Sequence, residues 1–201
     1  AKFIDPLSDK VTCDRDIPLL KKLGVNVIRV YQIDTTKSHD YCMQELAKNG
    51  IYVIADLSEP EQSIVREHPK FTTEIFQRYI DVIDVMAQYS NTLGFFAGNE
   101  VTNDKATSLA SAYVKASVRD IKTYMRKATA DGKIPRLVPV GYSTNDDPDV
   151  RLQLMDYFLC NTTPENAIDF YGVNIYEWCG YSSYVSSGYK ERTEEHKDYP
   201  I

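Results

Sequence analysis

The residues with the clearest chemical potential follow a short apolar run near the middle of the chain. In the segment GFFAGNEV, residues 94–101, small and aromatic residues give way to Gly98, Asn99 and Glu100. A carboxylate at the end of a buried segment is costly unless it has a partner or a chemical task. Glu100 is therefore our first candidate for a proton donor. Asn99 beside it is a candidate hydrogen-bond donor to a hydroxyl group of the substrate.

Polar side chains also end the other apolar runs of the chain. They are Tyr31-Gln32, Asp56, Tyr142-Ser143-Thr144-Asn145-Asp146 and Asn174-Ile175-Tyr176-Glu177-Trp178. Carboxylates, amides and aromatic rings dominate these ends, whereas His39, His68 and His196 lie elsewhere. A histidine-ligated metal and a serine triad are therefore disfavoured, and we expect no metal and no other cofactor. Carboxyl groups combined with aromatic faces instead suit glycoside hydrolysis.

Each candidate also has an ordinary structural interpretation. Glu100 could be a structural carboxylate paired with Arg29, because structural ion pairs perturb carboxylates as catalytic sites do. Asp56 could bind a substrate hydroxyl group or cap a helix. Tyr31 and Tyr176 could be core aromatics with satisfied hydroxyl groups, which is the commoner fate of buried tyrosine.

Short apolar runs rich in β-branched residues predict strands that are buried on both faces. They span residues 25–31, 51–57, 93–97, 137–142 and 170–175. In the segments that flank these runs, apolar residues recur at three- and four-residue steps, which predicts amphipathic helices. The helices span residues 14–23, 39–48, 71–89, 107–127 and 148–158.

This alternation of strands and helices argues for parallel strands joined by right-handed crossovers. A doubly wound sheet and a (β/α)8 barrel both fit, but no GxGxxG or GxxxxGK follows an expected strand, which favours the barrel. The expected strands are too few to close an eight-stranded barrel. We therefore expect residues 1–201 to be the central portion of a single α/β (β/α)8 TIM-barrel catalytic domain. This portion would hold about strands 2 to 6, without the first strand and the last two.

Composition narrows the range of partners. The chain has 201 residues, 43% of them hydrophobic, with 23 basic and 29 acidic residues and a net charge of −6. No block of like charges suggests a nucleic-acid arm, so nucleic acid is a poor candidate partner. No apolar run approaches the roughly 20 residues of a membrane helix, and the N-terminal AKFIDPLSD lacks the pattern of a signal peptide.

The cysteines and one sequon bear on the cellular compartment. Cys13, Cys42, Cys160 and Cys179 lie far apart without CxxC pairs, which favours disulfides in an oxidising compartment over a zinc site. Buried, reduced cysteines are the alternative. The sequence Asn-Thr-Thr at 161–163 is a glycosylation sequon, so Asn161 is a candidate glycosylation site of a secreted protein.

Several long segments, in order, resemble a known family. They are VNVIRVYQIDTT, YVIADLSEP, LGFFAGNEVTN, PVGYSTNDD and DFYGVNIYEWCGYSSY. These segments closely resemble the fungal β-1,3-glucanosyltransferases of glycoside hydrolase family 72, and the resemblance spans nearly the whole chain. It implies a (β/α)8 catalytic domain in which Glu100 is the general acid/base and Asn99 holds the 2-hydroxyl group of the sugar. It also implies that Tyr31, Asp56 and Tyr176 line the glucan-binding groove, with Tyr176 near the nucleophile.

The same resemblance implies roles for the cysteines and for a second carboxylate. Cys13 and Cys42 resemble the family's first disulfide. Cys160 and Cys179 resemble cysteines whose partners lie further along a complete chain. The family's nucleophile is a second glutamate at the end of strand 7, in a phrase resembling FFSEYG, which we expect beyond residue 201.

The function implied by this resemblance is transfer between β-1,3-glucan chains. A retaining enzyme of this kind would cleave an internal β-1,3-glucan linkage, form a covalent glycosyl-enzyme and pass the new end to a second chain for fungal cell-wall assembly. It would be secreted and held at the cell surface, with a glycolipid anchor outside this chain as its only membrane attachment. A hydrolytic endo-β-1,3-glucanase and a non-catalytic glucan-binding wall protein are the alternatives.

Overall fold

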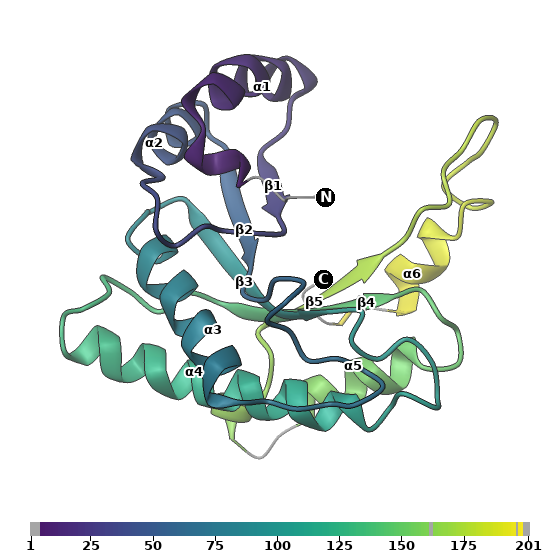
Figure 1. The fold of residues 1–201 in the computed structure, drawn as a ribbon. Coiled ribbons are helices and arrows are strands. Elements are labelled where there is room, and N and C mark those ends of the chain that lie inside the picture. The colour runs from purple at the N-terminus through teal and green to yellow at the C-terminus, as the bar shows by residue number, and fades with distance from the viewer. Residues whose placement is uncertain (1–4, 161–162, 196, 199–201) are drawn as a thin grey trace.

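A computed structural model describes residues 5–160, 163–195 and 197–198, and it contains one sheet of five parallel strands. The strands are β1 (Val27–Val30), β2 (Tyr52–Asp56), β3 (Thr92–Asn99), β4 (Val140–Asn145) and β5 (Phe170–Asn174). Each strand pairs with the next one along the chain, in the order β1-β2-β3-β4-β5 (Figure 1). A doubly wound sheet would reverse its order at a switch point. The sequential order therefore confirms a half-barrel, the arrangement of a partial (β/α)8 barrel.

Helices flank this curved sheet. They are α1 (Lys10–Leu23), α2 (Asp40–Lys48), α3 (Thr73–Met86), α4 (Ala110–Ala130), α5 (Arg151–Leu159) and α6 (Tyr189–Glu195), with short 3₁₀ turns η1 (Pro6–Ser8) and η2 (Pro164–Asn166). Helices α1 to α5 lie along the outer side of the sheet, and α6 lies near the carboxyl ends of β4 and β5 (Figure 1). Helix α1 begins four residues before the predicted start, because the side chain of Asp9 caps the N–H of Val11. It ends where expected, at Gly24, whose φ of 79° suits glycine. None of the described helices has both the length and the hydropathy needed to cross a membrane.

The two faces of the sheet differ in burial. On β2 and just after it, Val53, Ala55 and Leu57 are fully buried in the apolar core. Alternate side chains of each strand point to the opposite, inner face. There, Val27 at the beginning of β1 is 37% exposed and its neighbour Tyr52 at the beginning of β2 is 46% exposed. The prediction of strands buried on both faces is therefore wrong for the beginnings of β1 and β2 on this inner face, because in a half-barrel no opposing strands cover it. It is confirmed nearer the strand ends, where Asp56 and Ser143 are buried.

An aromatic pair fills the middle of the inner face. The rings of Phe96 and Phe170 lie 5.1 Å apart. Glycines make room for them: a Cβ atom added at Gly94, Gly141 or Gly172 would lie 2.9, 2.6 or 2.9 Å from one of these two rings. Real Cβ atoms essentially never come that close. The glycines of three neighbouring strands thus leave room for two aromatic rings, which form the floor of the site. The guanidinium of Arg29 packs against one of them, Phe96.

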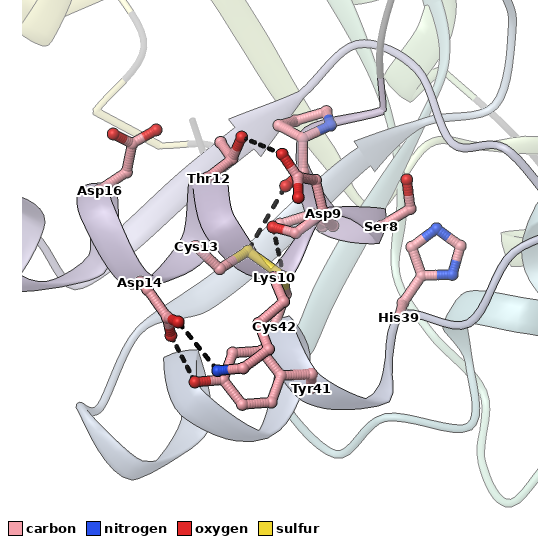
Figure 2. Close-up of a disulfide and its surroundings, with 12 residues drawn as sticks. Ser8, Asp9, Lys10, Thr12, Cys13, Asp14, Asp16, His39, Tyr41 and Cys42 are labelled. Carbon is pink, nitrogen blue, oxygen red and sulfur yellow. Dashed lines mark hydrogen bonds and ion pairs between the residues drawn. A yellow bond between two sulfur atoms is a disulfide. The ribbon is translucent and has the colours of Figure 1, made fainter.

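A disulfide joins the first two helices. Cys13 of α1 and Cys42 of α2 are bonded, with Cα atoms 5.7 Å apart, as the resemblance implied (Figure 2). The alternative of reduced cysteines is therefore wrong for this pair. Cys160 and Cys179 are exposed thiols within the described residues, so their pairing elsewhere stays a prediction. The glycosylation candidate Asn161 lies outside the described residues.

Candidate active site

A bulge in β3 determines which side chains reach the site. Phe96 pairs with Gly141 and Asn99 pairs with Ser143, so three steps along β3 oppose two steps along β4. The extra residue is a β-bulge, which reverses the alternation of side chains beyond it. Without the bulge, Asn99 would point outward, away from Arg29. The bulge therefore turns the amide of Asn99 to the inner face.

The backbone of Glu100, immediately after β3, has an unusual conformation. Its φ of 48° lies in the left-handed region, which non-glycine residues rarely adopt outside turns and functional sites. Two hydrogen bonds hold it: the Glu100 N–H donates to the carbonyl of Ser143 at 2.8 Å, and Arg66 Nη2 donates to the Glu100 carbonyl at 2.6 Å. The neighbouring strand and the β2–α3 loop therefore fix the direction in which the Glu100 side chain leaves the backbone.

Arg29 of β1 is the centre of the polar network on the inner face. Its Nε and Nη2 donate to Asp56 Oδ1 and Oδ2 at 2.8 and 2.7 Å, and Nη2 also donates to Asn99 Oδ1 at 2.9 Å. Its Nη1 donates to Ser143 Oγ at 3.1 Å and to Asn174 Oδ1 at 3.3 Å. These contacts use all the N–H donors of a guanidinium. One side chain thus connects β1 to each of the four other strands.

The guanidinium of Arg29 lies between two aromatic rings. Its Cζ is 4.6 Å from the ring centroid of Tyr31 and 4.3 Å from that of Phe96, distances typical of cation–π contacts. Its partner Asp56 is only 3% exposed. Burial raises the pKa of the Asp56 carboxyl, and the hydrogen bonds from Arg29 oppose that rise.

The geometry of Asp56 matches neither of the two interpretations given from the sequence. Both of its oxygen atoms are bound by Arg29, and α3 begins far from it, at Thr73. It is therefore not a helix cap, and it has little surface to offer a sugar. A positioning role, in which Asp56 holds Arg29, is what the contacts favour.

Glu100 is half-buried, and its carboxyl group accepts a hydrogen bond from Asn174. Glu100 Oε1 lies 2.7 Å from Asn174 Nδ2. The predicted alternative, an ion pair between Glu100 and Arg29, is wrong because the guanidinium binds Asp56 instead. Among the side chains that the structure describes, none forms an ion pair with Glu100. A neutral amide, and not a positively charged side chain, thus holds the carboxyl group in place.

The side-chain amide of Asn99 has a defined orientation. Its Oδ1 accepts hydrogen bonds from Arg29 Nη2 at 2.9 Å and from Asn174 Nδ2 at 3.0 Å. Because Oδ1 faces two donors, Nδ2 is the atom left to donate to a ligand. This orientation agrees with the expected contact between Asn99 and a substrate hydroxyl group.

Two tyrosines stand at the rim of the site. Tyr31 is 52% exposed and Tyr176 83% exposed, so neither is the core aromatic that the structural interpretation required. Burial of one side of Tyr31 raises the pKa of its hydroxyl group, Arg29 opposes the rise, and the neighbouring Tyr176 adds to it. The structure therefore brings Tyr31, Asp56, Asn99, Glu100 and Tyr176 to one end of the sheet.

A cavity adjoins the network on the side of the β2–α3 loop. It has a volume of about 270 Å³ and is lined by Ser58, Arg66 and neighbouring loop residues, by Tyr79, and by the end of β3 including Asn99. Within the described residues, no group of three or more His, Cys, Asp or Glu side chains could hold a metal ion. The available chemistry is that of one partly exposed carboxyl group and several oriented amides.

The positioning residues of this site are harder to predict from the sequence. Ser143 and Asn174 stand out only as polar strand ends, and no sequence pattern marks Arg66. One signal was available for Arg29: it is a single charged residue within the otherwise apolar run VNVIRVY, and a buried charge needs partners. The identity of those partners depends on strand order and register, which the sequence does not show directly.

Comparisons with known proteins give the family. A model of glycoside hydrolase family 72, described as glucanosyltransferase, matches residues 1–201. The chain is 54% identical over 199 residues to 1,3-beta-glucanosyltransferase GAS2 of Saccharomyces cerevisiae, covering 99% of this chain and 34% of that protein. It is 48% identical over 200 residues to pH-responsive protein 1 of Candida albicans, covering 100% of this chain and 35% of that protein. The chain thus spans about a third of the length of these curated relatives.

Solved structures agree with this similarity. The structure of Saccharomyces cerevisiae GAS2P in complex with laminaritriose and laminaritetraose matches with a TM-score of 0.91 and 54% identity, covering 100% of this chain and 45% of that chain. A glutamate-to-glutamine mutant of GAS2P, in complex with laminaritetraose and laminaripentaose, matches with a TM-score of 0.91 and 53% identity, covering 100% of this chain and 44% of that chain. The extent of the family match and the identity to these relatives show that the chain belongs to glycoside hydrolase family 72, the glucanosyltransferases.

Proposed function

We propose that the full-length protein is a retaining β-1,3-glucanosyltransferase, which cleaves an internal linkage of one β-1,3-glucan chain and joins the new end to another. The observation that carries this proposal is the carboxyl group of Glu100. It is half-buried at the bulged end of β3, and it is held by the Asn174 amide rather than by a cation. Membership of family 72 supports the proposal, as do the laminari-oligosaccharides bound to the relative GAS2P.

Glu100 has one task in each half of the reaction. In the first half, it gives its proton to the glycosidic oxygen as the bond from that oxygen to C1 breaks, while a second carboxylate bonds to C1. In the second half, it takes the proton of an acceptor hydroxyl group as that oxygen displaces the carboxylate from C1. Asn99 suits the 2-hydroxyl group of the same sugar, because Nδ2 is its remaining donor.

A second carboxyl group is needed about 5 Å from Glu100. Asp56 is the other carboxylate of the Arg29 network, but both of its oxygen atoms accept hydrogen bonds from Arg29. A carboxylate bound in this way is a poor nucleophile. We therefore infer that the nucleophile is a glutamate beyond residue 201, on another strand of one (β/α)8 domain of which β1 to β5 are the central strands.

Transfer requires that a glucan acceptor outcompetes water, which is present at about 55 M, by being held close to the reacting carbon. The exposed rings of Tyr31 and Tyr176 border the network and give flat faces on which sugar rings can stack. We infer that the glucan groove passes over these rings and beside the cavity of the β2–α3 loop. The Cys13–Cys42 disulfide supports an oxidising compartment. This agrees with a secreted protein at the cell surface, with any glycolipid anchor outside this chain.

The test is the length of the products formed by the full-length protein from one laminari-oligosaccharide of defined length. We expect products longer than the substrate, and we expect Glu100→Gln to lower their rate of formation by about 10²- to 10⁴-fold. Products that are only shorter would instead identify a hydrolytic endo-β-1,3-glucanase. Binding without cleavage would identify a glucan-binding protein. A Glu100→Gln variant with full activity would reject the role given to Glu100.

A further inference from the structure

The side chain of Asn174 has every hydrogen-bonding position occupied. Its Nδ2 donates to Glu100 Oε1 at 2.7 Å and to Asn99 Oδ1 at 3.0 Å. Its Oδ1 accepts from Ser143 Oγ at 2.8 Å and from Arg29 Nη1 at 3.3 Å. An asparagine side chain has two N–H donors and two oxygen lone pairs, so this residue is committed entirely to the network.

The amide of Asn174 can adopt only one of its two orientations. If it were flipped, its N–H groups would face Arg29 Nη1, which is also a donor and can never accept. Ser143 alone would not decide the matter, because a hydroxyl group can donate or accept. The guanidinium of Arg29, fixed by Asp56, therefore determines that the donor end of Asn174 faces Glu100.

This orientation distinguishes the two oxygen atoms of Glu100. A proton on Oε1 would point at the N–H of Asn174, whereas a proton on Oε2 leaves the hydrogen bond to Oε1 intact. We propose that Asn174 is a positioning residue that occupies Oε1 of Glu100 and thereby makes Oε2 the oxygen that delivers and accepts the proton. This inference rests on the acid/base role of Glu100 in the function proposed above.

The proposal fits both halves of the transfer reaction without a further reactant. The proton leaves Oε2 for the glycosidic oxygen of the departing glucan, and the carboxylate that remains keeps its hydrogen bond from Asn174. The proton of the acceptor hydroxyl group later returns to Oε2. In both halves Asn174 stops the carboxyl group from rotating, so the same oxygen faces the glycosidic bond throughout.

The test uses Asn174→Asp and Asn174→Ala in the full-length protein. Aspartate keeps the oxygen that faces Arg29 and Ser143 but replaces the donor that faces Glu100. For cleavage of a laminari-oligosaccharide, whose leaving sugar needs a proton, we expect kcat/KM to fall at least about 10-fold in both variants. For a dinitrophenyl β-laminari-oligosaccharide, whose leaving group needs no proton, we expect a change of less than about 2-fold.

The comparison of the two substrates gives the discriminating readout. A merely structural defect would lower kcat/KM on both substrates alike, because both need the same folded site. Equal losses on the two substrates would therefore overturn the proposal.

Asn91→Asp is the matched control. Asn91 is also a buried asparagine whose Nδ2 donates two hydrogen bonds, to the carbonyls of Met43 and Ile51 at 3.0 and 3.2 Å, but it precedes β3 at the opposite end of the sheet. We expect this variant to lose stability while the ratio of its kcat/KM values on the two substrates stays as in the wild-type protein. A change of this ratio in Asn91→Asp as large as in Asn174→Asp would mean that the ratio reports destabilisation, which would also overturn the proposal.

A neutron structure of the deuterated wild-type protein tests the proposal without any variant. With Glu100 protonated, we expect the deuteron on Oε2, and a deuteron on Oε1 would overturn the assignment even if the Asn174 variants did not fold. Failure of the proposed function looks different. In that case the wild-type protein would not cleave the laminari-oligosaccharide, or Glu100→Gln would remain active.

Discussion

The buried pair between Arg29 and Asp56 makes a strong prediction for the variant Asp56→Asn. The two side chains are 18% and 4% exposed and are joined by two charge-assisted hydrogen bonds of 2.8 and 2.7 Å. Asparagine has nearly the same shape, but it keeps only one acceptor toward Arg29 and places an N–H₂ group against a guanidinium N–H. The charge of Arg29 is then left without its partner.

The expected cost follows from this geometry. Breaking a buried pair by removing one partner typically costs about 3–5 kcal/mol, since the other charge stays buried. About 1 kcal/mol corresponds to roughly 2–4 °C in Tm for a domain of 150–250 residues and to less for a larger one, so we expect Tm of the full-length protein to fall by up to roughly 20 °C. The loss would be a large part of a typical total stability of about 5–15 kcal/mol.

The assay is thermal and denaturant unfolding of the full-length protein, with Asp120→Asn as the matched control. Asp120 also pairs with an arginine, Arg119, at 2.7 Å, but the two side chains are 37% and 54% exposed. An exposed pair of this kind contributes about 0–1 kcal/mol. If Asp56→Asn cost no more than Asp120→Asn, the reasoning that makes Arg29 and Asp56 the centre of the site would be refuted.

Two further predictions concern the floor of the site and the first two helices. Gly141→Ala would place a Cβ atom 2.6 Å from the Phe170 ring, so we expect a loss of about 1–3 kcal/mol from overpacking. In Gly132→Ala a Cβ meets nothing within 4 Å but φ is 72°, so we expect about 1 kcal/mol from backbone strain alone. An unchanged free energy of unfolding in Gly141→Ala would contradict the close packing. Replacing Cys13 and Cys42 together with serine opens a loop closed over a sequence separation of 29 residues. We expect the free energy of unfolding to fall by about 2–4 kcal/mol. A double variant that unfolds at the same midpoint as the wild-type protein under oxidising conditions would contradict this.

The sequence predicts the alternation of elements well because apolar periodicity carries that information directly. All five strands and the helices α1 to α5 follow the expected order. Helix α6 was not expected, and the reason is physical: none of its residues is buried. Ion pairs attach it instead, with Arg192 bound to Asp146 at 2.6 Å and Glu195 bound to Arg151 at 2.8 Å. Such contacts leave no apolar stripe in the sequence.

The candidate site was only partly predictable for a different reason. The carboxylate and amide at 99–100 stand out in the sequence, but the bulge that turns Asn99 inward does not, because an extra residue in β3 exists only relative to its pairing with β4. Gly98 was the available hint, since glycine within a strand often marks a bulge. The pairing of Arg29 with Asp56, rather than with Glu100, depends on which strand ends lie opposite each other across the inner face.

The most direct measurement of the central claim, that Glu100 is the general acid/base, uses Glu100→Ala in the full-length protein with a dinitrophenyl β-laminari-oligosaccharide. This leaving group needs no proton, so the glycosyl-enzyme should form, and its breakdown should become slow because no base activates the acceptor. Added azide, which needs no base, should then raise kcat and give a β-glycosyl azide. No acceleration by azide, or a glycosyl azide of the α configuration, would contradict the role of Glu100.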